Sequence, residues 1–600
     1  MTYRAPVNDI MFALNTAVGL PDLIERGVYG DLDTDTIAAV LEEAGKFGTD
    51  VLEPLNWSGD QTGAKRDVDG NVTTPEGFAD AYRQFAEGGW AALPGPESHG
   101  GQGLPEIVSM AASEVWNATN MAFGLCPLLT QGAVDALRIG GSDALKDRYL
   151  PKMISGEWTG TMNLTEPHAG SDLSVLKARA ERRDDGSYRV FGTKIYITYG
   201  EHDFTDNIIH FVLARLPDAP EGTKGISLFL VPKVLVEDDG SLGARNDVVC
   251  AGIEHKLGIH ASPTCTMKYG ESGEGAVGYL VGEENRGLAT MFIMMNAARL
   301  AVGMQGVAIA DRATQRAVAY ANERRQGKAV RTGPAVGGDM VPIVEHPDVR
   351  RTLITMQAMT QAARAICLMT AREMDIAHKG KTDEERATAA ARAALLTPVA
   401  KAFSTDIGCE VASLGIQMHG GMGFVEETGA AQYYRDARIL PIYEGTNGIQ
   451  AIDLALRKLP LGNGTVVQTY LDELGETAKQ VRASNQPEFG LMGQRLSDGV
   501  AALREATAWM TDQIKESPEG ALASATPYLR LFGLVAGGSY LADGALAAAR
   551  DGTITNGHAK HVSWARVFAE TQLPQAPGLA ASITTSADGI LGVPLERLSA

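Results

Sequence analysis

Apolar residues recur every three or four positions along most of this chain, which is the spacing of helices that bury one face. The pattern predicts long helices over Arg286–Arg325, His346–His378 and Glu384–Met418. It continues with Ala-rich helical stretches over Leu496–Ile514 and Tyr528–Arg550. Runs of this length are typical of the packed helices of a bundle.

Two earlier stretches of the chain have different textures. From Thr34 to Leu150 the pattern is also mostly helical, and a Gly/Pro-rich segment interrupts it. Between Gly160 and Gly282, β-branched and aromatic residues predict strands, and Asp-Gly pairs supply tight turns between them. The predicted strands are Tyr188–Thr198, Asn207–Arg215 and Gly225–Pro232. This middle part of the chain therefore reads as a compact β domain.

The chain is too long for one hydrophobic core, since cores stop growing near roughly 250 to 300 residues. The order helical, β, helical, helical is not the alternation that builds a parallel sheet. We expect an α+β protein, mainly α, with an extra helical domain at its C-terminal end. The expected division is a leader over 1–33, a helical N-terminal domain over 34–157, a β domain over 158–282, a helical bundle over 283–459 and the extra helical domain over 465–600.

The composition of the chain restricts the kinds of partner that it is expected to bind. Lys plus Arg number 53 and Asp plus Glu number 73, a net charge of −20 that would repel a phosphate backbone. No nucleic acid partner is expected. We find no signal-peptide pattern and no continuous apolar run of the length of a membrane span, so we expect a cytoplasmic protein without one. Five widely spaced cysteines favour neither a disulfide framework nor a metal site.

The first candidate site is the segment from Met162 to Asp172, which follows a predicted strand. It crowds small and hydroxyl residues around a proline and a glycine. Exposed backbone N–H groups and hydroxyls there could hold a pyrophosphate or the edge of a heterocycle. The alternative is an ordinary turn, with Ser171 or Asp172 as its cap.

The second candidate lies on the predicted strand 188–198, where Tyr196 and Thr198 share one face if the strand alternates. An aromatic side chain there could stack on a planar ring while the hydroxyl binds it, or it could simply close a sheet face. The chain also contains one G-x-G-x-x-G, from Gly273 to Gly278. Because a strand pattern rather than a helix follows it, it reads as a glycine-rich loop and not as a nucleotide fingerprint.

The third candidate is Glu444, which lies between apolar residues and the start of a predicted helix, with Thr446 or Asn447 as N-cap. Apolar burial raises a carboxylate pKa, whereas a helix N-terminus favours the ionised form. This balance suits a general base, although a solvated glutamate at a helix start is the alternative. No histidine pair has metal-ligand spacing, and neither H-E-x-x-H nor G-x-S-x-G occurs.

Taken together, these segments resemble the acyl-CoA dehydrogenase family of flavoproteins over about Thr34–Leu459. Four ordered motifs carry the resemblance: Leu164–Asp172, Gly192–Thr198, Gly282–Gly287 and Tyr443–Thr446. The N-terminal leader and the C-terminal extension are most similar to a long bacterial branch of that family, whose substrates include 3-methylmercaptopropionyl-CoA.

The resemblance implies FAD as cofactor and Glu444 as the base that removes the α-proton of an acyl-CoA, giving a trans-2-enoyl-CoA. The implied FAD contacts are Met162, Leu164, Thr165, Gly170, Ser171, Tyr196, Thr198 and Thr446. The implied substrate contacts are Ser171, Arg299, Glu444 and Gly445. Contacts to the FAD of a neighbouring subunit fall on Arg324, Gln417 and Gly421. No metal is implied.

The resemblance also implies partners. We expect a fatty acyl-CoA or 3-methylmercaptopropionyl-CoA as substrate, electron-transfer flavoprotein as acceptor, and a homodimer. Two alternatives stay open. One is an acyl-CoA oxidase, in which oxygen reoxidises the flavin directly. The other is a DNA-associated flavoprotein of the alkylation-response type, against which the net charge of −20 argues.

Overall fold

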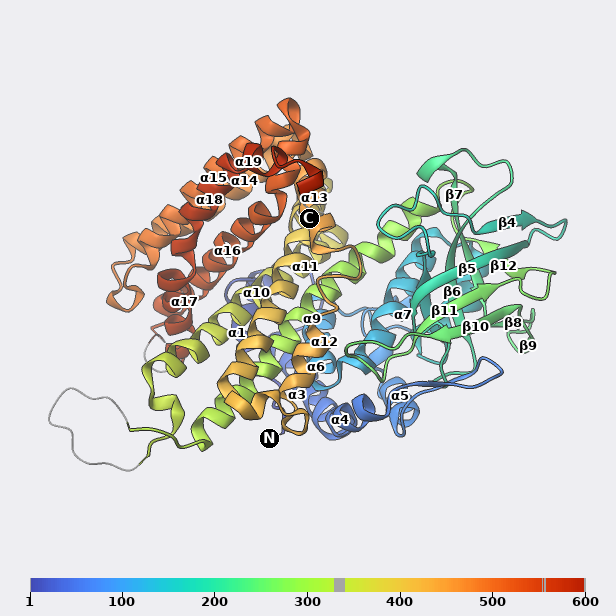
Figure 1. Cartoon of the computed structure of the whole chain (residues 1–600), viewed down its shortest axis with the longest axis horizontal. Coiled ribbons are helices and arrows are strands. Elements are labelled where there is room, and N and C mark those ends of the chain that lie inside the picture. Colours follow the sequence, from blue (N-terminus) through green and yellow to red (C-terminus); the bar gives the residue numbers. More distant parts are fainter. Residues whose placement is uncertain (1, 329–339, 553, 555–556, 598–600) are drawn as a thin grey trace. The chain divides into compact units, whose positions relative to one another are not determined.

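The computed structural model describes residues 2–328, 340–552, 554 and 557–597 (Figure 1). Helices dominate and one main sheet is present, which confirms the predicted mainly α, α+β class. Contacts divide the chain into two compact units. We call them the sheet unit, Lys46–Pro105 with Val115–Ala301, and the helical unit, Met1–Gly45 with Glu106–Glu114 and Val302–Ala600.

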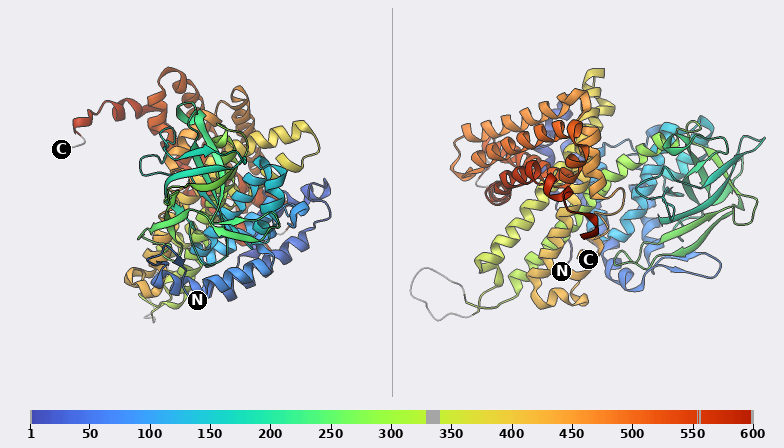
Figure 2. Two further views of the ribbon diagram at one scale, coloured as in Figure 1. Left: turned by 90° about the vertical axis from the view of Figure 1, so that its right-hand side faces the viewer. Right: turned by 45° about the horizontal axis from the view of Figure 1, so that its top comes forward.

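Two long helices, α10 (Pro347–Lys379) and α11 (Asp383–His419), run side by side in the helical unit (Figures 1 and 2). A third, α9 (Gly287–Glu323), enters this unit at Val302. All three match the predicted helices to within a few residues. Two short helices follow them, α12 (Ala430–Ala437) and α13 (Asn447–Asp453).

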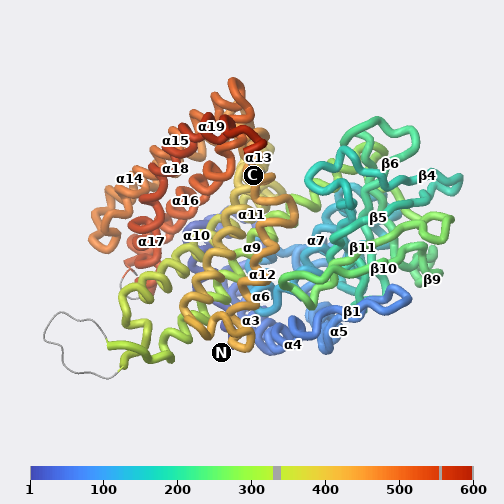
Figure 3. Tube along the Cα trace, viewed as in Figure 1, coloured from blue at the N-terminus to red at the C-terminus, as the bar shows by residue number. Residues whose placement is uncertain are grey.

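The C-terminal helices of the helical unit pack on one another (orange to red in Figure 3). They are α14 (Thr465–Ala483), α15 (Met492–Glu516), α16 (Pro518–Arg550), α17 (Ala559–Thr571), α18 (Ala576–Thr585) and α19 (Ala587–Leu591). The predicted linker before α14 contains Gly462, Asn463 and Gly464 in left-handed conformation, and Gly464 is the N-cap of α14. The predicted helices 496–514 and 528–550 are confirmed as parts of α15 and α16.

Within the described residues, two helices, α9 and α16, are long and apolar enough to cross a membrane by length and composition alone. The apolar window of α9 is 72% buried and that of α16 is 83% buried in the structure. Since core helices of packed domains pass the same test, their burial accounts for their composition without a membrane.

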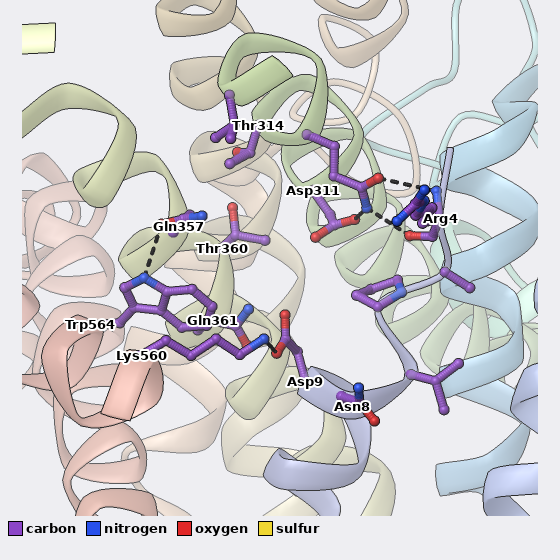
Figure 4. A pocket seen from close by; sticks show the side chains of 15 residues that line it. Arg4, Asn8, Asp9, Asp311, Thr314, Gln357, Thr360, Gln361, Lys560 and Trp564 are labelled. Atoms are coloured by element: carbon purple, nitrogen blue, oxygen red, sulfur yellow. Dashed lines mark hydrogen bonds and ion pairs between the residues drawn. The ribbon is translucent and has the colours of Figure 1, made fainter. Parts of the chain in front are cut away.

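The N-terminal segment is tied to the helical unit. It contains α1 (Val7–Asn15) and α2 (Leu20–Glu25), and α3 (Thr34–Phe47) follows. Gln315 Nε2 donates to the Arg4 carbonyl at 2.9 Å, and Asp9 Oδ1 lies 2.9 Å from His561 Nε2. A cavity of about 330 Å³ lies between this segment, α9, α10 and α17, with Gln357 accepting a hydrogen bond from the Trp564 indole on its wall (Figure 4).

The sheet unit is built on an eight-stranded sheet in the order β10-β11-β5-β12-β7-β6-β3, with β4 paired to β5 and β6. Its strands are β3 (Thr159–Asn163), β4 (Arg179–Arg182), β5 (Tyr188–Thr198), β6 (Ile208–Arg215), β7 (Ile226–Pro232), β10 (Val248–Ile253), β11 (Thr264–Tyr269) and β12 (Ala276–Leu280). The predicted strands correspond to β5, β6 and β7. Strand β12 begins inside the G-x-G-x-x-G, at Ala276, so a strand and not a helix follows its first glycines, as predicted.

Helices α4 (Glu53–Thr62), α5 (Phe78–Glu87), α7 (Met121–Gly140) and α8 (Asp143–Ile154) belong to the same unit, and α6 (Glu106–Thr119) ends in it. Helix α7 packs on β3 so closely that a Cβ at Gly160 would lie 2.5 Å from the Ala133 Cβ. Two small hairpins were not predicted, β1 (Lys65–Arg66) with β2 (Val72–Thr73) and β8 (Val234–Val236) with β9 (Leu242–Arg245). Strands of two to four residues are too short for a pattern to reveal.

Candidate active site

The exposed aromatic Tyr196 lies at a bulge in β5. Cys265 of β11 pairs with Ile197, but Met267 pairs with Lys194, so Ile195 and Tyr196 together oppose Thr266. Tyr196 has a φ of 60° and its side chain is 61% exposed. A left-handed φ costs a residue with a side chain roughly 1–2 kcal/mol, and bulges often re-aim a side chain next to active sites. Strict alternation along β5 is therefore wrong at this point, because the bulge adds a residue there.

Several predicted cofactor residues lie around this bulge. The Ile195 N–H donates to the Thr165 carbonyl at 2.9 Å, which places Thr165 beside Tyr196. The Thr161 hydroxyl donates to the Thr198 carbonyl at 2.8 Å, which ties β3 to the end of β5. Met162 is buried and Leu164 half-buried in the same core. The sheet unit thus brings together an exposed ring, two half-buried threonines and an apolar edge.

A buried ion pair supports the loop that carries Thr165. Lys194 Nζ lies 2.9 Å from Glu166 Oε1 and donates to the Leu164 carbonyl at 3.0 Å, and the two charged side chains are 0% and 3% exposed. Glu166 also accepts the N–H groups of Lys177 and Ala178 at 2.8 and 2.9 Å. Burial opposes ionisation of this carboxylate, yet Lys194 and these N–H groups hold the Glu166 pKa below its usual value.

This pair had no role in the sequence interpretation, although both residues belong to recognised motifs. Burial lowers the pKa of Lys194 to about 8 despite the attraction of Glu166. The sequence does show that Lys194 and Glu166 are charged residues within motifs that are otherwise rich in small or apolar residues. Without the strand register, nothing in the sequence indicated that they would meet.

The remaining predicted residues of the sheet unit take two kinds of position. Gly170 and Ser171 are exposed on the loop, and a Cβ at Gly170 would meet only the Thr165 side chain at 3.9 Å. Asp172 accepts the Ser174 N–H at 2.8 Å, so it closes a local turn and caps no helix. Arg299 lies in the sheet-unit part of α9 and is 4% exposed.

In the helical unit, Glu444 sits in a left-handed turn just before α13. Its φ is 55° and that of Gly445 is 80°. Thr446 is the N-cap of α13, and its hydroxyl accepts the Ile449 N–H at 3.2 Å, so of the two predicted caps Thr446 is correct. Gln450, which is fully buried, donates to the carbonyls of Glu444 and Gly445 at 3.2 and 3.3 Å.

Hydrogen bonds from neighbouring helices anchor both ends of this turn. On one side, the Tyr443 hydroxyl donates to Gln305 Oε1 on α9. On the other, Lys401 Nζ of α11 donates to Asn447 Oδ1 at 2.9 Å and to the Leu440 carbonyl at 2.9 Å. Burial raises the Tyr443 pKa well above its usual value, so this hydroxyl stays a donor. The backbone around Glu444 is therefore fixed by neighbouring helices.

Three further predicted residues are exposed in the helical unit. Gln417 lies in the last turn of α11 and Gly421 in the 3₁₀ turn after it. Arg324 follows α9 directly, and its carbonyl accepts the Ile343 N–H at 2.8 Å. All three positions are exposed, so a ligand or a second subunit can reach them. Among the described residues, no group of His, Cys, Asp and Glu could hold a metal ion.

The sheet-unit residues fit a flat aromatic cofactor. Tyr196 exposes a ring on the surface of the sheet, where a strained backbone holds it. Thr165 and Thr198 are half-buried residues of the same region, and the exposed loop at Gly170 has room for a close approach of phosphate to backbone.

Comparison with known families gives matches along nearly the whole chain. Models described as acyl-CoA dehydrogenase N-terminal, middle and C-terminal domains match residues 34–157, 161–271 and 285–459. A model described as acetyl-CoA dehydrogenase C-terminal like matches residues 470–594. The C-terminal extension therefore has relatives of its own.

Among curated proteins, the chain is 47% identical to a 3-methylmercaptopropionyl-CoA dehydrogenase of Ruegeria pomeroyi, over 98% of this chain and 99% of the relative. Among solved structures, it resembles Caenorhabditis elegans ACDH-11 in complex with C11-CoA, with a TM-score of 0.76, 21% identity, and 95% and 92% of the two chains covered. It also resembles an acyl-CoA dehydrogenase from Bacillus anthracis complexed with FAD, with a TM-score of 0.74, 22% identity, and 95% and 90% covered. These two structures share the fold.

Proposed function

The chain belongs to the acyl-CoA dehydrogenase family, and from this premise we propose that it oxidises the Cα–Cβ bond of an acyl-CoA thioester. The family, the fold class, the enzyme class and FAD as cofactor, all predicted from the sequence, are confirmed. The observation that carries the proposed mechanism is a single carboxylate, Glu444, held on a rigid left-handed turn.

Glu444 would take the proton from the carbon next to the thioester carbonyl. That proton is weakly acidic, so the carbonyl oxygen must receive hydrogen bonds as enolate charge develops. The backbone N–H of Glu444 would be one such donor. Gly445, the next residue, would also contact the substrate. Because the turn fixes this N–H and the Cα of the carboxylate together, the proton acceptor and the oxyanion donor would keep a constant separation.

Bound FAD supplies the acceptor for the hydride that leaves the β-carbon. We assign Tyr196, Thr165 and Thr198 to its ring system, with Met162 and Leu164 as apolar contacts. Gly170 and Ser171 would lie near its pyrophosphate or the CoA arm, and Thr446 is also assigned to FAD. Arg299 would help to shape the substrate site. The exposed residues Arg324, Gln417 and Gly421 would contact the FAD of a second subunit.

The favoured substrate is 3-methylmercaptopropionyl-CoA. The full-length relationship at 47% identity to an enzyme named for that thioester supports it. A methylthio group is close in shape to an ethyl group, so an apolar pocket would separate this substrate from a short straight-chain thioester by only about 1–3 kcal/mol. Butyryl-CoA and related chains should therefore compete.

The remaining assignments belong to the same proposal. Electrons would pass to electron-transfer flavoprotein, and the enzyme would act as a cytoplasmic homodimer without a membrane span. The four-domain division predicted from the sequence, with a leader before it, is retained as a proposal. The test of the substrate assignment is an anaerobic titration of the purified holoenzyme with 3-methylmercaptopropionyl-CoA and with butyryl, octanoyl and palmitoyl thioesters. We expect the flavin to bleach fastest with the sulfur-containing chain. A preference for palmitoyl-CoA would overturn the assignment.

A further inference from the structure

The turn that carries Glu444 has two carbonyls that ordinary helix hydrogen bonding cannot satisfy. Glu444 and Gly445 both have left-handed φ angles and precede the N-cap of α13. Their carbonyls therefore lie outside the i to i−4 ladder of that helix, which begins with the Thr446 carbonyl accepting the Gln450 N–H at 3.0 Å. Another donor has to hold them.

Gln450 supplies that donor from the first turn of α13. Its Nε2 donates to the Glu444 carbonyl at 3.2 Å and to the Gly445 carbonyl at 3.3 Å. The side chain is fully buried. Both acceptors are carbonyl oxygens, which require the amide nitrogen on this side and so fix the orientation of the amide group.

The oxygen of the Gln450 amide indicates why this side chain is buried. Within the described part of the chain, Gln450 Oε1 has no hydrogen-bond partner. A buried polar atom without a partner is costly, and a helix position facing the core would otherwise favour an apolar side chain. The two bonds from Nε2 offset part of that cost. One goes to Glu444, which carries the proposed base and oxyanion donor, and the other to its neighbour Gly445.

Neighbouring side chains hold both ends of the segment from Tyr443 to Asn447. Asn447 is held by Lys401 and by the hydroxyl of Thr405, which lies 3.3 Å from its Oδ1, and Tyr443 is held by Gln305. Between these anchors, the carbonyls of Glu444 and Gly445 both accept from the side-chain amide of Gln450. Glycine next to a strained residue adds backbone freedom, so an unclamped turn would sample other conformations.

We propose that Gln450 is a positioning residue, whose amide clamps the Glu444–Gly445 turn and so fixes the direction of the Glu444 carboxylate and backbone N–H. This inference rests on the proposed function of Glu444 as base. Gln450 acts through the turn and not on substrate, so its loss should slow proton removal without weakening thioester binding. The clamp itself is a property of the backbone and can be measured without turnover.

The test compares purified holoenzymes of the wild type, Gln450→Met and Gln361→Met. Methionine has about the volume of glutamine but no donor. Gln361 is a matched control, since it is a glutamine on a long helix of the same unit, is 8% exposed and lines the separate cavity of Figure 4. Amide hydrogen exchange is followed in the peptide spanning residues 441–450, and flavin reduction by substrate is followed by stopped flow.

For Gln450→Met we expect at least tenfold faster exchange in that peptide and flavin reduction slowed by about 10- to 100-fold, because small misplacements of a base have effects of this size. The KM should stay within about twofold, and Gln361→Met should change neither quantity. Unchanged exchange in residues 441–450 would overturn the clamp. Faster exchange with a wild-type reduction rate would overturn its role in positioning.

Two further outcomes are covered by additional comparisons. If Gln450→Met does not fold, Gln450→Asn keeps an amide on a shorter side chain and should show smaller changes in the same directions. If no thioester bleaches the flavin of the wild type, the proposed function fails, while the exchange comparison still decides whether Gln450 holds the turn.

Discussion

Lys194 and Glu166 form a buried ion pair, 2.9 Å between Nζ and Oε1, that joins the bulged strand β5 to the loop carrying Thr165. Replacing Lys194 by Met leaves the buried Glu166 carboxylate without its lysine partner, and breaking a buried ion pair in this way typically costs about 3–5 kcal/mol. We expect a clear fall in the thermal unfolding midpoint and a lower FAD content, read from the ratio of flavin to protein absorbance. The double variant Lys194→Met/Glu166→Gln should regain much of the stability, because no charge is then stranded. An equal fall of the unfolding midpoint in the single and the double variant would contradict the claim that the unpaired carboxylate causes the loss of stability.

Tyr196 offers a way to separate cofactor binding from stability. Its left-handed φ is strained for tyrosine and free for glycine, and its exposed ring adds little to the core. Tyr196→Gly should therefore leave the unfolding midpoint unchanged or slightly raised, while FAD binding to the apoenzyme weakens about three- to tenfold, as loss of an aromatic stacking contact does. Tyr196→Trp should keep wild-type affinity. If the glycine variant binds FAD as tightly as the wild type, the ring does not contact the cofactor.

Asp375 predicts a defined pH dependence of stability. Its carboxylate accepts the N–H groups of Glu106 and Ile107 at 2.7 and 3.2 Å, yet burial raises its pKa to about 6. Because the folded pKa lies above the unfolded value, the contribution of this group to stability is greatest at low pH and falls as the pH rises from about 4 to about 6.

Asp375→Asn removes this titration. The stability of the variant relative to the wild type should therefore increase by about 2 kcal/mol between pH 4.5 and pH 7.5, whatever its absolute stability. Chemical unfolding of both proteins at the two pH values measures the difference. A difference that stays constant with pH, or that moves in favour of the wild type, would show that Asp375 is not held with a raised pKa.

Each of the two alternative functions predicts a result that differs from the one expected of an acyl-CoA dehydrogenase. An oxidase would form hydrogen peroxide rapidly with substrate and air alone, whereas we expect turnover to need an added electron acceptor. A DNA-associated flavoprotein would bind duplex DNA in a salt-sensitive way, and a net charge of −20 predicts no such binding. Peroxide release and a fluorescence-based DNA titration at low salt decide between these readings.

The long helices and main strands could be predicted because each buries one face along a regular repeat. Helix α10, for example, begins one residue after its predicted start and ends one residue after its predicted end. The candidate residues Glu444 and Tyr196 were also found from sequence motifs. Their strained backbones were not, since a left-handed φ at a non-glycine residue leaves no periodic signal and is imposed by contacts made far along the chain.

The supporting residues escaped prediction for a related reason. Lys194 meets Glu166 only through the register of β5 with the loop after β3, and Gln305 meets Tyr443 across 138 residues. A lone charged or amide residue in an apolar motif shows that a buried partner must exist, because burial without one is costly. It does not identify the partner, which depends on the packing of whole elements.

The central claim is that Glu444 is the proton acceptor in the oxidation of an acyl-CoA thioester. The most direct measurement is the anaerobic rate of flavin bleaching by 3-methylmercaptopropionyl-CoA in the wild type and in Glu444→Gln. We predict rapid bleaching in the wild type and a loss of about 100-fold to 10,000-fold or more in the variant, with FAD content unchanged. Bleaching at the wild-type rate in Glu444→Gln would contradict the assignment.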